Sequence, residues 1–230
     1  MPDSSSALQL VLSADPTLFA IVRLSLLVSL SAVLLAAAIG LPLGAALALT
    51  HFPGRQFVIV VLNALMGLPP VVAGLAVFLL LSRSGPLGSW GILFTPAAMV
   101  IAQTLLVTPI IAALSRQTIE DLWLEYRDEL GAMNVRPVRR IGTLLWDARF
   151  SLVTAFLAGF GRAAAEVGAI IVVGGNIDNY TRTMTTAIAL ETSKGDLPLA
   201  VGLGLILIVI VTMVNALAWM VRRAGERMAA

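Results

Sequence analysis

The chain has 230 residues, of which 59% are hydrophobic and 12% are charged, and its formal net charge is +2. Soluble domains are about 45–50% apolar and about 25% charged, so long apolar blocks of this composition exclude a soluble domain and predict an integral membrane protein. The small net charge argues against a nucleic-acid-binding protein, and the lack of cysteine excludes disulfides and cysteine-ligated metals.

Five apolar runs predict five kinked transmembrane helices in a single all-α domain that covers residues 1–230. The N-terminal stretch holds no Lys or Arg before its first apolar residues, so it lacks the basic region of a cleaved signal peptide. We therefore expect the first span to act as its own targeting signal. The predicted spans are about 17–49, 56–81, 94–114, 150–173 and 197–221, with a polar segment at 115–149 and a loop at 174–196.

Prolines lie inside three of these spans, at Pro42, Pro69–Pro70 and Pro109. Each proline removes a backbone hydrogen bond and is expected to bend its helix. Such breaks persist at membrane depth where the backbone is buried in protein or lines a cavity. Three interrupted spans favour a transporter or channel over a simple anchor, and packing kinks are the alternative. Gly40 and Gly44 form a small-xxx-small face, which predicts close approach of a second helix.

The basic residues orient the predicted spans. With the N-terminus outside, ten Lys and Arg residues fall in inner segments and three fall in outer segments. The positive-inside rule then predicts an external N-terminus and a cytoplasmic C-terminus. In this orientation the segment 115–149 is cytoplasmic, and the loop 174–196 is external.

The sequence shows no catalytic constellation. The only histidine, His51, has no converging partners for a zinc site or a catalytic triad, and we interpret it as structural or solvated. Glu166 is the only carboxylate inside the predicted spans, which argues against an intramembrane hydrolase. The only lysine, Lys194, does not stand in a P-loop pattern. No cofactor is expected in this chain, and if ATP is the energy source, a separate subunit must hydrolyse it.

The segment 115–149 predicts a helix–turn–helix that projects from the membrane. A helix rich in Glu and Asp ends at Gly131, for which we expect the left-handed conformation beyond a helix end. A second polar stretch, which begins at Arg136, leads into the next span. This segment is too polar for lipid and too short for a domain, so docking on a partner is its expected role. A solvated connecting loop is the alternative.

Glu125, Gly131 and Ile141 lie at the positions that define the EAA loop of ABC importer permeases, which the segment resembles. Its pattern is E-A-A, three residues, G, nine residues and I-x-L-P. The two alanines are replaced by Tyr126-Arg127, and the Leu-Pro is replaced by Thr143-Leu144. In that family the loop inserts into a cleft of the ATPase subunit. The resemblance implies ATPase contacts at Glu125, Tyr126, Glu129, Leu130, Gly131, Ala132 and Arg136.

Further motifs extend this resemblance to nearly the whole chain. GLPLG at 40–44, GLPPVVAG at 67–74, GRAAAEVG at 161–168 and VGGNI at 173–177 resemble oxyanion importers of the molybdate, tungstate and sulfate group. TRTMTTAIALET at 181–192, followed by KGD at 194–196, is similar to the tungstate-specific permeases, with molybdate as the close alternative.

The resemblance implies a permease of the type I ABC importer fold, moved by alternating access. Five kinked helices are few for enclosing a path, so a homodimer with the path on its two-fold axis is the simplest arrangement. Its expected partners are a second copy, two ATPase subunits that bind ATP and Mg²⁺, and an external tungstate-binding protein. A self-sufficient channel or secondary carrier is the alternative, against which the polar segment 115–149 counts.

Arg162 and Glu166 lie one helical turn apart and face the same side of the fourth span. At ~1.5 Å per residue they lie ~18 Å and ~24 Å from the start of that span. An unpaired charge at this depth costs at least ~3 kcal/mol, so the two groups are expected to pair with each other and with other helices. A helix clamp, a path-lining pair and a gate remain open. Candidate path or clamp residues are Arg162, Glu166, Pro69, Pro70, Gly174, Gly175 and Asn176.

Gly174, Gly175 and Asn176 follow that span and allow two interpretations. Their backbone amides could form an anion site, or the two glycines could end a helix. Beyond them, residues 181–192 predict a short interfacial helix that ends before Gly195 and turns Met184, Ile188 and Leu190 inward. Because this region is expected outside, the predicted contacts with a substrate-binding protein are Asp178, Arg182 and Glu191.

Overall fold

The computed structural model describes residues 16–133 and 135–229, and every regular element in this part of the chain is a helix. The N-terminal stretch without a basic leader lies outside the described residues. The all-α class predicted from the apolar runs is therefore confirmed. The main helices are α2 (Pro16–Leu49), α3 (Arg55–Met66), α4 (Pro70–Leu81), α5 (Pro96–Ala132), α6 (Pro137–Asp147), α7 (Arg149–Ala164), α8 (Gly168–Gly174), α9 (Met184–Lys194) and α10 (Leu197–Ala229), with a 3-10 turn η1 (Gly88–Trp90).

Three of these helices, α2, α5 and α10, are each long and apolar enough to cross a membrane. Two bent pairs meet the same condition when each pair is taken as one span. The pair α3–α4 is bent by 103°, and α6–α7 is bent by 80°. Up to five spans are thus present by length and composition, in agreement with the five apolar runs.

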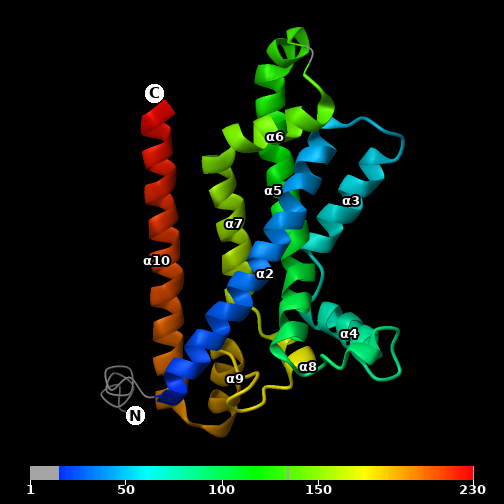
Figure 1. Ribbon diagram of the computed structural model, residues 1–230. Coiled ribbons are helices and arrows are strands. Elements are labelled where there is room, and N and C mark those ends of the chain that lie inside the picture. The colour runs from blue at the N-terminus through cyan, green and yellow to red at the C-terminus, as the bar shows by residue number, and fades with distance from the viewer. Residues whose placement is uncertain (1–15, 134, 230) are drawn as a thin grey trace.

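The helices place the hairpin formed by α5 and α6 at one end of the molecule (Figure 1). The C-terminal end of α10 points to the same end. The start of α2, the short helix α9 and the bent segment α4 lie at the opposite end (Figure 1). The polar hairpin and the C-terminus therefore share a side, and the loops around α9 lie across the molecule from them.

Close contact between α2 and α5 forms the centre of the fold. A Cβ atom added to Gly44 would lie 2.3 Å from the backbone oxygen of Ala112, and one added to Gly40 would lie 3.1 Å from that of Thr108. The small-xxx-small face therefore lets two backbones touch, as predicted. Val33 of α2 packs beside Ile111 of α5 in the same core cluster, which α7 also joins.

Two of the expected proline breaks are wrong. Pro42 and Pro109 lie inside continuous helices, because neighbouring helices and local adjustments can satisfy the backbone groups that a proline frees. At 67–69 the chain does break, between α3 and α4. A further break at 165–167, between α7 and α8, divides the fourth predicted span and was not foreseen.

Two helices continue beyond the predicted spans, at the end next to the polar groups. The helix expected to end near 114 continues as α5 to Ala132, and the last helix continues past 221 to Ala229. Gly131 is also not left-handed: it lies within α5, and Met133 caps the helix with φ −77°. The amide of Met133 donates to the oxygen of Glu129, which extends the helical pattern through the glycine.

Candidate functional site

The break between α7 and α8 holds the charged pair predicted from the sequence. Arg162 Nη1 donates to Glu166 Oε2 at 2.5 Å, and the Glu166 side chain is only 3% exposed. The other carboxylate oxygen, Oε1, accepts the backbone N–H of Ala169 at 3.0 Å, in the first turn of α8. Both oxygens of this buried carboxylate are thus used within the chain, as burial of a charge requires.

Two side chains from other helices bond to the backbone at the same break. Gln103 of α5 donates through Nε2 to the oxygen of Ala163 at 2.9 Å. Thr185 of α9 donates through its hydroxyl to the oxygen of Glu166 at 2.7 Å. The Ala163 oxygen, in the last turn of α7, also accepts the N–H of Glu166, and the Glu166 backbone oxygen lies between the two helices. The two side chains therefore connect α5 and α9 to the break. We refer to Gln103, Arg162, Glu166, Ala169 and Thr185 as the break cluster.

The sequence analysis missed Gln103 and Thr185. Gln103 is the only amide side chain in the apolar run 94–114, and that isolation was an available signal. Thr185 stands in a threonine-rich stretch where one member cannot be singled out. Gln103 Oε1 is buried, and it has no hydrogen-bond partner in the described part of the chain. The break cluster joins α5, α7, α8 and α9, which is the geometry of a helix clamp.

The second break, before α4, lies against the first through the packing of α4 on α8. A Cβ atom on Gly74 would lie 2.8 Å from Ala169 Cα, and one on Gly168 would lie 2.8 Å from a methyl carbon of Val71. Pro69 caps α4, and Pro70 occupies its first turn, where a proline needs no N–H partner. The proline pair therefore starts α4. Gly74 of α4 then packs against Ala169, which is the α8 member of the break cluster.

Gly174 and Gly175 form a hydrogen-bonded helix end, and Asn176 follows with φ 49° and a buried side-chain oxygen that has no partner in the described residues. Gly175 caps α8 in the left-handed conformation, with φ 71°, and its N–H donates to Ile171 within the helix pattern. The Thr181 hydroxyl donates to the Gly174 oxygen at 2.6 Å and accepts the N–H of Ile177. The amides of Gly175 and Ile177 are therefore bonded inside the chain, which favours the helix-stop interpretation over an anion site here.

The α5–α6 hairpin packs in a core that it shares with Ala45 and Ala48 of α2 and Leu152 of α7. Trp123, Tyr126 and Leu130 of α5 pack with Ile141 of α6 around buried Leu144. Arg140 lies over the Trp123 ring at 5.5 Å and donates to the oxygen of Val135 at 2.8 Å. Of the predicted ATPase-contact residues, Tyr126 and Leu130 are partly buried in this core, and the exposed ones are Glu125, Glu129, Gly131, Ala132 and Arg136.

An ion-pair network connects the hairpin to the rest of the fold. Glu120 pairs with Arg116 at 2.5 Å and with Arg55 at 2.6 Å. Arg55 also donates through Nε to the oxygen of Leu47 at 2.7 Å, at the end of α2. These contacts link the polar part of α5 to α2 and α3. The sequence analysis missed this network, although the Arg116–Glu120 spacing was a signal for its first pair.

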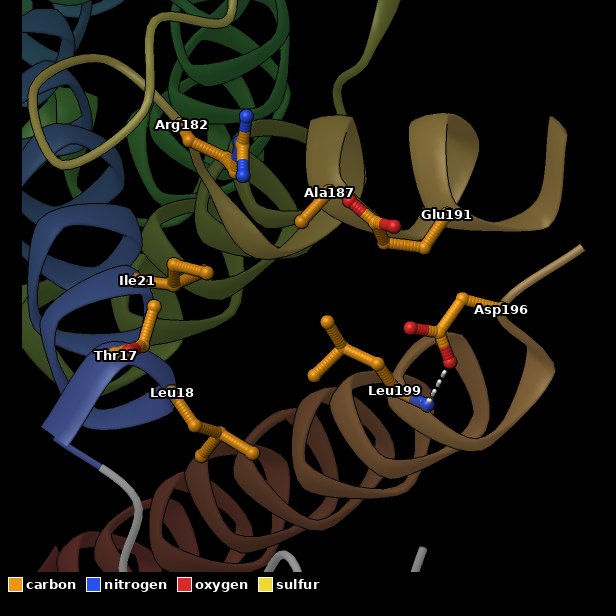
Figure 2. A pocket seen from close by; sticks show the side chains of 8 residues that line it. All are labelled: Thr17, Leu18, Ile21, Arg182, Ala187, Glu191, Asp196 and Leu199. Carbon is orange, nitrogen blue, oxygen red and sulfur yellow. Dashed lines mark hydrogen bonds between the residues drawn. The ribbon is translucent and has the colours of Figure 1, made fainter. Parts of the chain in front are cut away.

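At the opposite end, the three residues predicted to contact a binding protein lie around α9. Arg182 pairs with Asp178 at 3.0 Å, and Glu191 pairs with Lys194 at 3.1 Å. Figure 2 shows Arg182 and Glu191 lining one cavity of about 250 Å³ between α2, α9 and α10. The helix predicted at 181–192 is α9, which begins after a Thr183 capping box, ends before left-handed Gly195 and buries Met184.

His51 is exposed and lies beside Arg55 and Glu120 at the wall of another cavity. Across residues 16–133 and 135–229, no group of three or more His, Asp and Glu side chains is placed to hold a metal ion. The polar groups that converge in the described structure are therefore ion pairs and helix-end hydrogen bonds.

Comparison with known proteins identifies the family, although no family model matches the chain. The chain is 42% identical over 205 residues to a probable anion ABC transporter permease protein of Haloferax volcanii. This alignment covers 87% of this chain and 88% of that protein. The chain is 37% identical over 214 residues to the tungstate uptake system permease protein TupB of Peptoclostridium acidaminophilum, with 93% and 94% covered. It is 30% identical over 209 residues to the sulfate transport system permease protein CysW of a Synechocystis strain, with 84% and 73% covered.

The helical fold and its membrane spans define a multi-pass membrane protein. Likeness over nearly the full length then shows that the chain belongs to the ABC transporter permeases of the tungstate, sulfate and molybdate family. It is the permease subunit of an ABC anion importer. Permeases of this kind have no ATPase site of their own, which agrees with the missing P-loop.

Proposed function

We propose that this permease imports tungstate. The observation that carries the proposal is its likeness to a tungstate uptake permease over more than nine-tenths of both chains. The stretch 181–192, which resembles tungstate-specific permeases, forms α9 and the turn before it. Through the Thr183 capping box and Thr185, this stretch is built into the fold beside the break cluster.

The proposed complex contains two copies of this chain, two ATPase subunits that bind ATP and Mg²⁺, and one external tungstate-binding protein. The permease lies in the plasma membrane with its N-terminus outside, which places the α5–α6 hairpin in the cytoplasm. The exposed surface around Glu125, Glu129 and Gly131 docks on the ATPase. The α9 end faces the binding protein with Asp178 exposed and Arg182 partly exposed, whereas Glu191, at 6% exposure, is too buried for the direct contact expected from the sequence.

Motion reaches the membrane through contacts that the structure already contains. The α5–α6 hairpin shares a core with the end of α2 and the start of α7, so a push on the hairpin reaches both of those helices. The Glu120 network connects it to the end of α2 and the start of α3. The break cluster holds α7, α8 and α9 together against α5. Alternating access is then a movement of these connected helices, driven by ATP binding and hydrolysis in the partner subunits.

Import of sulfate or molybdate is the alternative substrate assignment, and the likeness to a sulfate permease supports it. Because an external binding protein selects the anion before delivery, the permease has to admit one tetrahedral dianion rather than distinguish among several. The alternative therefore changes the cargo and leaves the roles of the hairpin and the break cluster unchanged.

Transport by the complete complex in proteoliposomes tests the proposal. The permease and its ATPase are reconstituted with ATP inside, the tungstate-binding protein is added outside, and accumulated tungsten is measured by mass spectrometry. We expect ATP-dependent uptake that requires the binding protein. Parallel runs use binding proteins for molybdate and sulfate. ATP-dependent uptake only with the molybdate or sulfate binding protein would reject tungstate, and gradient-driven uptake by the permease alone would reject the coupled mechanism.

A further inference from the structure

Two arginines from separate elements line one small cavity at the α9 end of the molecule. Arg23 lies on α2, and Arg182 lies between α8 and α9. The cavity has a volume of about 190 Å³. Its remaining lining combines polar and apolar side chains from the same two regions, namely Ala20, Ile21, Leu24, Asn179 and Tyr180.

This cavity differs from the neighbouring one in Figure 2. Ile21 and Arg182 line both cavities, so they form the wall between them. The neighbouring cavity contains the carboxylates of Glu191 and Asp196 (Figure 2). By contrast, the residues that line the smaller cavity include two cations and no carboxylate. The two sides of the Arg182 wall therefore have opposite electrostatic character.

The two guanidinium groups have unused hydrogen-bonding capacity. Arg182 Nη1 pairs with Asp178 at 3.0 Å, but its Nε is buried and has no hydrogen-bond partner in the described residues. Within the described part of the chain, Arg23 makes no hydrogen bond or ion pair. Asp178 pairs with Arg182 alone, and the exposed Arg23 has no partner among the described residues, so a net positive charge remains at the cavity. Guanidinium groups bind planar pairs of oxyanion oxygens with charge-assisted hydrogen bonds.

The loop that completes the cavity is held in place by its own hydrogen bonds. The oxygen of Ile177 accepts the N–H groups of Tyr180, Thr181 and Arg182. Asn179 takes a left-handed conformation, with φ 55°, which turns the chain tightly at this point. Asn179 and Tyr180 are therefore presented to the cavity by an ordered loop, and their side chains supply amide and hydroxyl donors.

We propose that this cavity binds a tetrahedral oxyanion, between Arg23 and Arg182. Two cations, an amide and a hydroxyl suit such an anion, because each can donate a hydrogen bond to its oxygens. The anion is either free in solution or the phosphate of a lipid headgroup. The site lies at the α9 end of the fold, apart from the break cluster, and it rests on the proposed function only where free tungstate is taken as its source.

Anion binding to the full-length permease tests this site without the ATPase or the binding protein. The chain is placed in nanodiscs of neutral phosphatidylcholine, and the dissociation constants of tungstate and sulfate are measured by calorimetry. We expect Arg23→Gln to weaken binding by about tenfold or more, the effect of losing a charge-assisted pair of about 1.4 kcal/mol. Arg23→Lys keeps the charge and should retain binding within about threefold.

Arg83→Gln is the matched control, because Arg83 is an exposed arginine outside this cavity. A second arm replaces part of the neutral lipid with phosphatidylglycerol, omits free oxyanion and measures retained lipid by native mass spectrometry. Retention that depends on Arg23, without free-anion binding, would assign the site to lipid phosphate. If Arg23→Gln behaves like Arg83→Gln in both arms, the site is overturned. Loss of anion binding with intact transport would separate this site from the proposed function.

Discussion

The break before α4 and the break between α7 and α8 are made in different ways. Before α4 the chain ends a helix at Gly67 and starts another with Pro69 and Pro70, so covalent restriction makes the break. Between α7 and α8 the break contains no proline, and Glu166 holds it by pairing with Arg162 and bonding to Ala169. A break made by the backbone itself needs little from its surroundings, whereas one made by buried side chains depends on every partner.

This contrast predicts the largest effect for Glu166→Ala. The substitution removes the partner of Arg162 and the acceptor of the Ala169 N–H together. Breaking a buried ion pair from one side costs up to about 3–5 kcal/mol, less here because the remaining Arg162 is 29% exposed, and the unbonded N–H of Ala169 adds about 1–3 kcal/mol. We expect a large fall in folded permease, measured as monodisperse protein extracted from membranes. Glu129→Ala, at an exposed carboxylate on α5, is the control and should leave the yield unchanged. A normal yield for Glu166→Ala would contradict the clamp.

Arg162→Ala should have the next largest effect. It leaves the buried Glu166 carboxylate with one hydrogen bond and no cation, at a cost of about 3 kcal/mol. The clamp interpretation predicts that the variant loses assembled protein more than it changes the choice between tungstate and molybdate. Uptake is therefore normalised to the amount of assembled complex. A normal protein level with a changed anion preference would place Arg162 in the path instead.

Gly74→Ala tests the contact between the two breaks. The added methyl group would lie 2.8 Å from Ala169 Cα, so α4 has to move away from α8. Overpacking of this kind costs about 1–3 kcal/mol, and we expect a lower thermal unfolding midpoint in detergent. Gly204→Ala is the control, because an added methyl group there meets no atom within 4 Å. Equal midpoints for the two variants would mean that the breaks are not packed together.

Pro69→Ala should have the smallest effect. Pro69 is exposed, and alanine can supply the backbone oxygen that accepts the N–H groups of Val72 and Ala73. Pro70 remains in the first turn of α4 and continues to restrict the chain at the break. We expect a change in unfolding free energy within about 1 kcal/mol, the range typical of surface positions. Loss of folded protein comparable to that of Glu166→Ala would remove the distinction between the two breaks.

The sequence predicted the spans well where composition alone decides them. The apolar runs marked α2, α5 and α10, and the mixed charge of 115–149 marked the hairpin. Proline positions were a weaker guide, because Pro42 and Pro109 are accommodated by the helices packed around them. Whether a proline breaks a helix depends on tertiary neighbours, which local sequence does not specify.

The sequence predicted only part of the candidate site, because the remaining contacts depend on tertiary packing. The Arg162–Glu166 pair follows from local spacing, and the structure contains it. Gln103 lies 60 positions from its partner Ala163, and Thr185 lies 19 positions from Glu166. Such partners depend on how α5 and α9 pack, so a single sequence identifies the charges at the break and misses the groups that complete their hydrogen bonding.

The central claim is that a separate ATPase subunit moves this chain through the α5–α6 hairpin. Gly131→Asp tests it most directly, because an added side chain at this exposed helical glycine meets no atom within 4 Å and should leave the hairpin folded. Gly142→Asp places the same charge on α6 at an equally open glycine. The account predicts that Gly131→Asp abolishes co-purification and stimulation of the ATPase, while Gly142→Asp retains both. Full ATPase binding and stimulation by Gly131→Asp would contradict it.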